Sequence, residues 1–340
     1  MTDLNPARIT EIGMGFMASK TLLSAVELGL FTTLSDRRMT GPEIGQELGL
    51  HSRAIPDFPD ALLALGFLER DGDGPNARYG NTPETAAFLD KTKPGYIGGI
   101  LDMCNHRNYG FWGDLSEGLK TGQSQNEVKH NGKPLFESLY AEPARLEEFM
   151  QAMAGISRLP ARAFAEKFDF SPYKTLADIG GATGVLSLAI AARHPHIRAT
   201  SCDLPAVLPI AKRTIDKAGL SDRVTPTALD FFTDSFPKVD VITMGMILHD
   251  WNLDRKKMLI AKAYDALPKG GAFIVIEQLI DDARRHHVPG LLMSLNMLIE
   301  CADGFDYTGA DFRDWCLDAG FARVEILPLA GPMSAGIAYK

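Results

Sequence analysis

The sequence predicts an α/β protein of two domains, with a doubly wound, mostly parallel sheet of seven strands in the C-terminal domain. The main observation is that apolar runs alternate with helical stretches from residue 175 onward, as expected when helices cover both faces of a parallel sheet. The second is length, because 340 residues exceed one compact core. We expect a helical, winged-helix-like domain over residues 1–100 and the sheet domain over residues 101–340.

The N-terminal domain is predicted from short helical patterns. Residues 19–34, SKTLLSAVELGLFTTL, have apolar positions at the spacing of an amphipathic helix. Thr40 with Glu43 predicts a helix N-cap. Residues 55–82 then indicate a helix, a strand, a glycine-rich turn and a second strand, which together have a winged-helix outline.

A winged helix can bind DNA, but the charge of this domain argues against it. Residues 1–100 contain nine Lys or Arg and thirteen Asp or Glu, so 9 − 13 gives −4, whereas phosphate contacts need positive charge. We instead expect a homodimer through this domain, because one short helix rarely buries so many apolar residues alone. The residues concerned are Met14, Phe16, Met17, Leu22, Leu23 and Val26.

Residues 101–170 are expected to form a helical connector, with long helices over 135–170, and residues 171–340 the sheet core. The predicted parallel strands lie in TLADIG, RATSCD, VTPTALD, VDVITMGMIL and GAFIVIEQLI. The last two runs, FARVEILPL and SAGIAYK, are joined by a short link and predict an antiparallel hairpin at the sheet edge.

Composition excludes several classes of protein. The net charge of −8 disfavours nucleic-acid binding. The four cysteines have no spacing typical of a metal site, so no metal is expected. Because no targeting segment and no apolar stretch of about 18 to 20 residues is present, we expect a cytoplasmic protein that does not enter membranes.

The stretch TLADIGGATG, residues 175–184, combines a predicted strand with three glycines. A dinucleotide fingerprint starting at Gly180 would need glycines where Ala182 and Val185 stand, and the lysine of a phosphate-binding loop is absent. Asp178 precedes the glycines and would repel a pyrophosphate. The turn therefore predicts a ligand that carries positive charge.

S-adenosylmethionine has that chemistry, because it combines a sulfonium, an amino group and ribose hydroxyls that need an acceptor. Asp203 ends the next predicted strand and Asp230 the third. In open α/β sheets, acids at these ends line the ligand crevice, and one of them can accept both ribose hydroxyls. The alternative is that an individual acid only caps the helix that follows it.

Several motifs resemble one known family in order and spacing. LADIGGATG, CDLPAV, LDFF, ILHDWN, ALPKGGAFIVIEQ and DAGF are similar to those of the caffeate, isoflavone and hydroxyindole type O-methyltransferases, which include many bacterial enzymes of secondary metabolism. The similarity extends over essentially the whole chain, including the N-terminal dimerisation half. It implies a Rossmann-like methyltransferase domain that uses S-adenosylmethionine and releases S-adenosylhomocysteine.

The resemblance also implies roles for individual residues. His249 matches the catalytic base, Glu277 the acid that orients it, and Asp306 a second acid that is usually glutamate. Cofactor contacts are implied for the methionine part at Asp178 and Gly180, the ribose at Asp203 with Leu204, the adenine at Asp230 with Phe231, and a nearby serine, Ser157. Segments that line the acceptor pocket in the family contain Met103, His106, Tyr109, Trp112, Phe149, Met153, Met297 and Phe305.

Physical chemistry supports the histidine independently, because a phenol needs to lose its proton and histidine titrates nearest neutrality. Two positions depart from the family. Gly245 stands where many relatives carry a lysine or arginine near the adenine. Asp306 is one methylene shorter than glutamate, so its hydrogen bond to His249 is expected to be longer or to pass through water.

The leading prediction is therefore methyl transfer to a hydroxyl of a small aromatic metabolite, without a metal. Methylation of carbon or nitrogen on the same scaffold is the first alternative. The others are a relative that binds the cofactor but no longer methylates, and an acidic winged-helix regulator.

Overall fold

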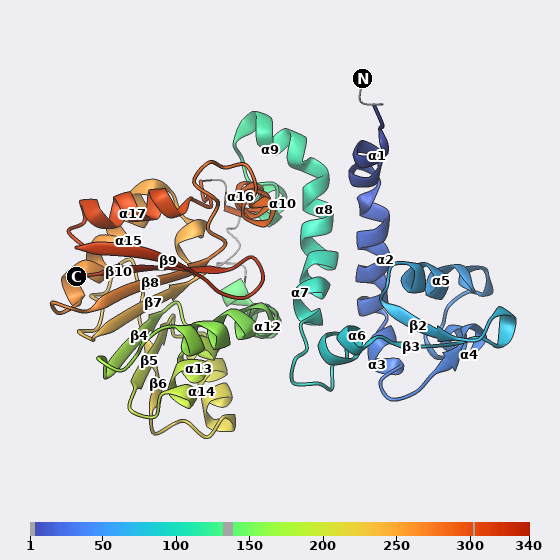
Figure 1. The fold of residues 1–340 in the computed structure, drawn as a ribbon, viewed down its shortest axis with the longest axis horizontal. Coiled ribbons are helices and arrows are strands. Elements are labelled where there is room, and N and C mark those ends of the chain that lie inside the picture. The colour runs from blue at the N-terminus through green and yellow to red at the C-terminus, as the bar shows by residue number, and fades with distance from the viewer. Residues whose placement is uncertain (1–3, 132–138, 302) are drawn as a thin grey trace. The chain divides into compact units, whose positions relative to one another are not determined.

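The computed structural model describes residues 4–131, 139–301 and 303–340. The chain forms two compact units, residues 1–110 and 111–340, whose elements are labelled in Figure 1. The sequence analysis divides the chain at residue 100, whereas the segment 101–110 belongs to the first unit.

The first unit packs short helices around a three-stranded antiparallel sheet with the order β1-β3-β2. The fold class expected for this part of the chain is confirmed, including the helix, strand, turn and strand of a winged helix. Its elements, with η for a 3₁₀ or π turn, are α1 (Ala7–Gly13), α2 (Gly15–Glu27), α3 (Leu30–Thr33), β1 (Met39–Thr40), α4 (Gly41–Glu47), η1 (Ser52–Ala54), α5 (Asp57–Ala64), β2 (Leu68–Asp71), η2 (Gly74–Asn76), β3 (Arg78–Asn81), α6 (Pro83–Phe88), α7 (Gly98–Met103) and η3 (Cys104–Asn108).

Local sequence explains where these helices begin and end. The predicted cap of α4 is confirmed: the Glu43 amide donates to the Thr40 hydroxyl at 3.4 Å, and the Glu43 carboxylate accepts from the Thr40 amide at 2.7 Å. The helix predicted over residues 19–34 is interrupted at Gly29, whose φ of +72° lies in the left-handed region that favours glycine. That residue separates α2 from α3.

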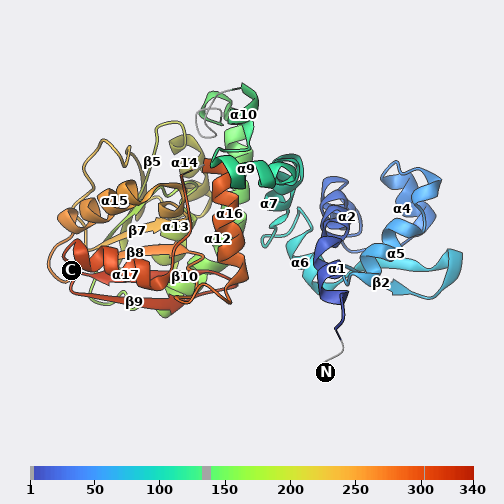
Figure 2. The ribbon, with the colours of Figure 1, turned by 90° about the horizontal axis from the view of Figure 1, so that it is seen from above.

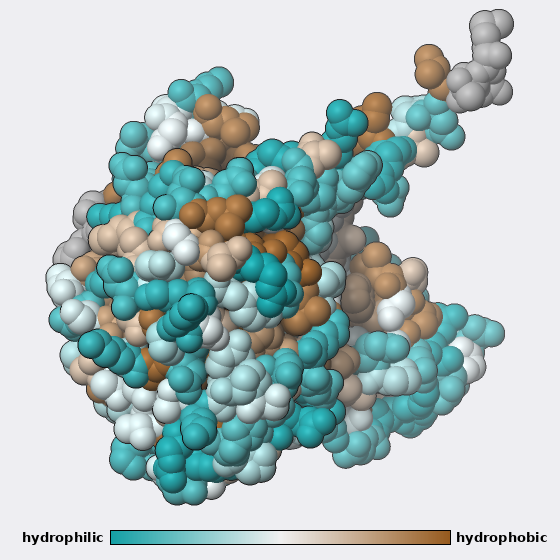
Figure 3. All heavy atoms as spheres, turned by 60° about the vertical axis from the view of Figure 1, so that its left-hand side comes forward, coloured by the Kyte–Doolittle hydropathy of each residue, from teal (hydrophilic) through white to brown (hydrophobic). Residues whose placement is uncertain are grey.

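The N-terminal helices expose apolar side chains. Ile9, Ile12 and Phe16 are 77%, 65% and 55% exposed, and Figure 3 shows brown atoms on this segment next to the grey N-terminal residues. Not all of the residues expected on that surface lie there, because Leu23 and Val26 are buried in the core of the unit.

The second unit is built on a seven-stranded sheet with the order β6-β5-β4-β7-β8-β10-β9. Strands β4 to β8 are parallel, and β10 is antiparallel to both of its neighbours, so the predicted mostly parallel sheet and terminal hairpin are confirmed. The elements that follow α8 (Tyr109–Phe111) are η4 (Trp112–Asp114), α9 (Leu115–Thr121), α10 (Glu127–Asn131), α12 (Pro143–Lys167), β4 (Thr175–Ile179), α13 (Val185–Arg193), β5 (Arg198–Asp203), α14 (Leu208–Lys217), β6 (Val224–Ala228), β7 (Val241–Gly245), η5 (Leu248–Asp250), α15 (Leu253–Ala266), β8 (Ala272–Glu277), α16 (Val288–Cys301), α17 (Gly309–Asp318), β9 (Arg323–Pro328) and β10 (Ser334–Tyr339).

Helices cover both faces of this sheet, as Figures 1 and 2 show. On one face, Phe164 of α12, Ile190 of α13 and Ile215 of α14 are buried in one apolar cluster. On the other face, Leu259 of α15 and Phe312 of α17 belong to a second cluster. Part of the predicted helical stretch 135–170 falls on residues 132–138, outside the described ranges.

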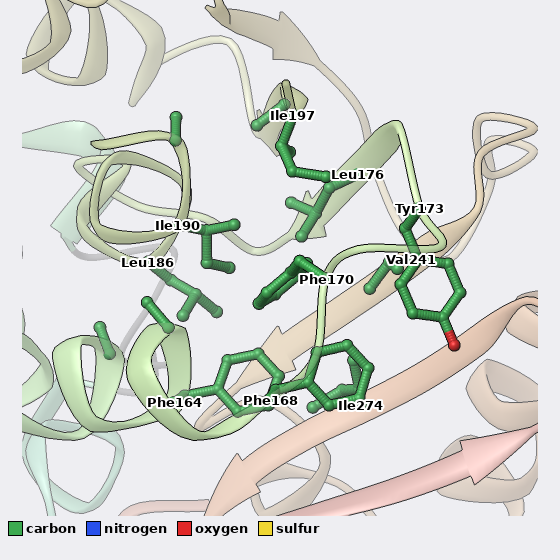
Figure 4. Packing of buried hydrophobic residues seen from close by; sticks show 14 of the residues in the cluster. Phe164, Phe168, Phe170, Tyr173, Leu176, Leu186, Ile190, Ile197, Val241 and Ile274 are labelled. Carbon is green, nitrogen blue, oxygen red and sulfur yellow. The ribbon is translucent and has the colours of Figure 1, made fainter. Parts of the chain in front are cut away.

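An aromatic cluster links the end of α12 to the start of β4 (Figure 4). The ring of Phe168 stacks on Phe164 and on Tyr173, with centroids 5.2 and 5.8 Å apart, and meets Phe170 edge-on at 4.8 Å. Such contacts stabilise beyond the area they bury. They fix the position of β4, whose carboxyl end leads into the glycine turn.

The site is placed by the topology of the sheet. Strand β4 lies between β5 and β7, so the strand order reverses there. Open α/β sheets bind ligands at such a switch point, beyond the carboxyl ends of the strands. In the described ranges, no helix is both long and apolar enough to cross a membrane.

Candidate active site

The glycine turn after β4 is shaped by close backbone contacts. Gly180 has a φ of +71°, and a side chain there would collide with Ile247. A side chain at Gly181 would collide with the Ser201 hydroxyl. The amides of both glycines donate to the Cys202 carbonyl, at 2.9 and 3.0 Å. The turn therefore lies against the end of β5, where only glycine fits.

Asp203, the last residue of β5, is oriented by this turn. Its Oδ2 accepts from the Ala182 amide at 2.8 Å and its Oδ1 from the Leu204 amide at 2.7 Å. Burial raises the pKa of Asp203, while these two amides act in the opposite direction. Each carboxylate oxygen keeps a second lone pair, so Asp203 can accept further hydrogen bonds from a ligand.

Asp178 is only 2% exposed and supports the turn from beneath. Its carboxylate accepts from Thr243 of β7 at 2.7 Å and from Ser187 of α13 at 3.3 Å. Burial raises the pKa of Asp178 to about 6, although both hydroxyls lower it. The structure thus shows a carboxylate that joins β7 to α13, and the predicted contact of Asp178 with a ligand stays a prediction.

Asp230 does not end a strand, as the sequence analysis expected, because β6 stops at Ala228. Its Oδ1 accepts from the Phe232 amide at 2.8 Å, so Asp230 supports a turn rather than the start of a helix. Lys262 of α15 donates to the Phe231 carbonyl at 2.6 Å. This cation, which the sequence analysis missed, supports the segment that follows β6.

His249 lies in η5, just beyond β7, with its side chain only 6% exposed. Its Nδ1 is 3.4 Å from Oδ1 of Asp306, and its Nε2 is 3.5 Å from Oδ1 of Asp250. Burial lowers the pKa of His249, but the carboxylates of Asp250, Asp306 and Glu277 outweigh this and raise it to about 10. The ring is a strong base held between two acids.

Glu277, at the end of β8, holds the histidine through the backbone. Its Oε1 accepts from the amides of Ile247, Leu248 and His249 at 3.1, 2.7 and 3.4 Å. Among the described residues, no hydrogen bond joins it to the His249 ring, which the sequence analysis expected it to orient. The reason is topological, because β8 is the neighbour of β7 and its last side chain reaches the turn that follows β7.

Asp306 reaches the ring directly. The distance of 3.4 Å from its Oδ1 to Nδ1 of His249 leaves no room for a bridging water, but it exceeds the usual length of an N–H···O bond. Catalytic hydrogen bonds are often long before substrate binds. Neither atom has a hydrogen-bond partner among the described residues, so the expected bond between Asp306 and His249 stays a prediction.

Gly304 explains how Asp306 is brought so close. A Cβ atom at Gly304 would lie 2.7 Å from the Asp250 carbonyl oxygen and 2.8 Å from that of His249. The 303–307 segment therefore packs its backbone directly on the histidine turn.

We expect Gly304→Ala to lower the free energy of unfolding by about 1–3 kcal/mol, because overpacking forces the two backbones apart. Urea denaturation measures this, with Gly245→Ala as the matched control, since no atom lies within 4 Å of a Cβ there. Equal stability of the two variants would contradict the packing argument.

The residues predicted to line an acceptor pocket are divided between the units. Met103, His106 and Tyr109 belong to the first unit, where the His106 ring contacts the Asp102 carbonyl at 2.9 Å and Tyr109 donates to the Phe16 carbonyl at 3.4 Å. In the second unit, Trp112 donates to Asn296 of α16 at 2.9 Å. Phe149, Met153 and the predicted cofactor residue Ser157 lie four residues apart on α12, and Met297 is buried on α16. Phe305 lies on no helix, in the segment between α16 and α17.

Two charged residues near His249 were not identified from the sequence. Asp250 was available from the motif itself, because it follows the histidine directly. Lys256 is completely buried on α15. Lys256 lies at helical spacing from the buried Leu259, Ile260 and Ala263, so the periodicity of α15 places it on the buried face of that helix. It was missed because two adjacent lysines, Lys256 and Lys257, are typical of a solvent-exposed surface.

Comparison with known proteins identifies two domain families. A family model described as an O-methyltransferase domain matches residues 112–322, and one described as an O-methyltransferase dimerisation domain matches residues 10–91. The family resemblance inferred from the motifs is thereby confirmed.

Similar proteins cover nearly the whole chain. The tetracenomycin polyketide synthesis 8-O-methyl transferase TcmO of Streptomyces glaucescens is 38% identical, over 98% of this chain and 97% of its own. The 3-hydroxy-5-methyl-1-naphthoate 3-O-methyltransferase of Streptomyces sahachiroi is 35% identical, over 98% and 94%. The N,N-dimethyltransferase OxyT of Streptomyces rimosus is 33% identical, over 92% and 90%.

Among solved structures, human N-acetylserotonin methyltransferase in complex with S-adenosylmethionine superposes with a TM-score of 0.91. It is 25% identical to this chain, and the match covers 100% of this chain and 99% of that one. The predicted fold class is confirmed.

Proposed function

Because this chain belongs to the O-methyltransferase family, we propose that it transfers the methyl group of S-adenosylmethionine to a hydroxyl of a small aromatic metabolite, with His249 as the general base. The observation that carries the proposal is the buried His249 ring between the carboxylates of Asp250 and Asp306. This ring lies beyond the carboxyl end of β7, the strand that neighbours β4 and its glycine turn.

The chain's own residues fit the cofactor. The glycine turn admits no side chain at Gly180 or Gly181, and Asp203 is held by backbone amides with lone pairs to spare for ribose hydroxyls. We assign the adenine to Asp230 and Phe231 and a further contact to Ser157, as the resemblance implies. When bound, S-adenosylmethionine supplies an electrophilic methyl group.

Proton removal is derived from the surroundings of His249. Nδ1 faces Asp306, which is 2% exposed, so the acceptor hydroxyl is expected at Nε2, on the side of Asp250. A phenol has a pKa of about 10, and the three carboxylates raise the pKa of His249 to about 10 as well. Transfer of the proton is then nearly balanced in free energy, and Asp306 stabilises the imidazolium that forms.

The similarity to an N,N-dimethyltransferase keeps methylation of nitrogen as the second candidate. Displacement at a methyl carbon does not depend on which atom attacks. A neutral amine attacks through its lone pair and needs no base to remove a proton first, whereas a hydroxyl does. The His249 environment therefore favours a hydroxyl acceptor.

The experiment incubates the protein with labelled S-adenosylmethionine and a panel of phenols, hydroxyindoles, hydroxynaphthoic acids and aromatic amines, and reads the mass gain of one methyl group. We expect phenolic products. Methylated amines alone would establish the second candidate, and cofactor binding without any product would indicate a relative that no longer methylates.

We also infer a homodimer through the first unit, since that unit matches the dimerisation domain over residues 10–91 and exposes apolar helices. Stable dimers bury about 2,000 Å² or more. Light scattering at micromolar concentration should therefore give twice the monomer mass. Phe16→Glu, which charges an exposed position, should shift the protein toward monomer, whereas a wild-type monomer would contradict the inference.

The cytoplasmic location expected from the sequence stays a prediction.

A further inference from the structure

Lys256 is a lysine whose side chain is completely buried. Its ammonium donates to the Trp251 carbonyl and lies 3.7 Å from the centre of the Phe305 ring. Trp251 follows the His249 turn directly, and Phe305 precedes Asp306. One cation on α15 thus contacts both chain segments that carry the groups around the imidazole.

We propose that Lys256 is a positioning residue for methyl transfer, which joins the His249 turn to the Asp306 segment and, at neutral pH, adds a positive charge beside the acids that surround the imidazole. This inference rests on the function proposed above. The charged groups around Lys256 are Asp250 from η5, Glu277 from β8, and Asp303 and Asp306 from the segment before α17.

The charges explain why a second cation is needed. When His249 gives up its proton, the acids around it lose their partner at the moment when the base must be ready. Lys256 lowers the pKa of both Asp250 and Glu277, against the burial that raises them. At neutral pH, where Lys256 is protonated, its loss is expected to make the carboxylates hold the imidazolium proton more tightly.

The lysine is kept at a cost to stability. Burial lowers the pKa of Lys256 to about 8, although the surrounding acids raise it. The folded pKa is therefore below the unfolded value of about 10.4, so the unfolded state binds more protons between these values and stability rises with pH across that window. A group that destabilises the fold at neutral pH is a candidate for function.

The test compares Lys256→Met, which keeps the length but removes the charge, with Lys257→Met on the same helix. Lys257 is exposed and pairs only at the surface with Asp318 at 3.5 Å, so its variant should behave as wild type. We expect Lys256→Met to lower kcat at neutral pH by about tenfold or more. The difference from wild type should narrow as pH rises through about 8, where Lys256 of the folded wild type loses its proton. The affinity for S-adenosylhomocysteine should change less than about twofold, since the ribose and glycine contacts are untouched.

The unfolding measurements do not require turnover, so they test the buried charge of Lys256 even if the proposed reaction is wrong. Lys256→Met should be at least as stable as wild type at pH 7 (a neutral reference) and should lose its relative advantage as pH rises. A loss of kcat in Lys256→Met that does not change with pH would overturn the proposal. Unfolding of Lys256→Met with loss of cofactor binding would also overturn it, because Lys256 would then be a structural residue. In a separate comparison, Lys256→Arg, which keeps the charge, should retain more activity than Lys256→Gln.

Discussion

Replacing His249 with alanine is expected to lower kcat for ordinary phenols by about 10²–10⁴, the range for loss of a positioned general base. The physical reason is the matched basicity of the ring, whose pKa of about 10 is set by Asp250, Asp306 and Glu277 against the effect of burial. Because Asp203 and the glycine turn are untouched, the affinity for S-adenosylhomocysteine should stay close to wild type.

The wild-type pH dependence follows from the same pKa. The neutral ring is a minor species at neutral pH, and its population rises about tenfold per pH unit up to the raised pKa. Turnover at saturating substrates should therefore still be increasing near pH 9, about a unit below that pKa. A rate that levels off near the ordinary histidine pKa would contradict the assignment of the raised value.

The acidity of the acceptor separates a base from a residue that only shapes the site. An acidic phenol, such as one with a nitro group, is already ionised at neutral pH and needs no base. The loss in His249→Ala should therefore be large for simple phenols and small for the acidic ones. His196, an exposed histidine of the same unit that contacts the Phe170 carbonyl at 3.1 Å, provides the control. An equal loss for all acceptors would mean that His249 acts by proximity alone.

The sequence predicts the sheet well because its strands are marked by continuous apolar runs. β4, β7 and β8 are buried on both faces, so they read as strands without any tertiary information. The break at Gly29 and the early end of β6 were not predicted, because an apolar pattern does not mark where a turn begins. The motif resemblance, rather than periodicity, located His249, Glu277 and Asp306.

What the sequence could not show is which atoms meet. Glu277 was expected at the imidazole, but its position on the strand next to β7 gives it the backbone amides of the histidine turn. The contact between Asp306 and His249 depends on the packing of Gly304 against that turn, although Gly304 lies 55 residues further along the chain than His249. The sequence also does not show which charged side chains are buried, because the buried Lys256 and the exposed Lys257 are adjacent residues of the same type.

Replacing Asp203 with alanine is expected to weaken cofactor binding by about 10²–10⁴. A hydrogen bond to a charged acceptor contributes about 1.5–3 kcal/mol, and two ribose hydroxyls are assigned to this carboxylate, with a tenfold change for each 1.4 kcal/mol or so. The variant also releases the Ala182 amide, which Asp203 holds at 2.8 Å in a residue with a φ of +48°. Calorimetry with S-adenosylhomocysteine measures the loss.

Two control variants define the origin of that loss. Asp203→Asn keeps the shape and one acceptor oxygen, so its affinity should fall between those of wild type and Asp203→Ala. Asp216→Ala removes the same charge from the surface of α14, where the acid pairs with Lys212, and should leave the affinity unchanged. If Asp203→Ala binds as wild type does, the ribose is held elsewhere.

The two largest predicted effects should also be separable. In the proposed reaction Asp203 binds the cofactor and His249 removes the acceptor proton. Saturating cofactor should therefore restore most of the turnover of Asp203→Ala but none of that lost in His249→Ala. Changes at residues that share no partner usually add in free energy, and the side-chain hydrogen bonds of Asp203 reach only Ala182 and Leu204 among the described residues. The double variant should therefore lose kcat as His249→Ala does and affinity as Asp203→Ala does. A loss of kcat in the double variant well beyond that of His249→Ala, with both substrates saturating, would show that the glycine turn and the histidine turn are coupled. Ile247 provides a route for such coupling, because it lies against Gly180 and precedes Leu248 of the histidine turn.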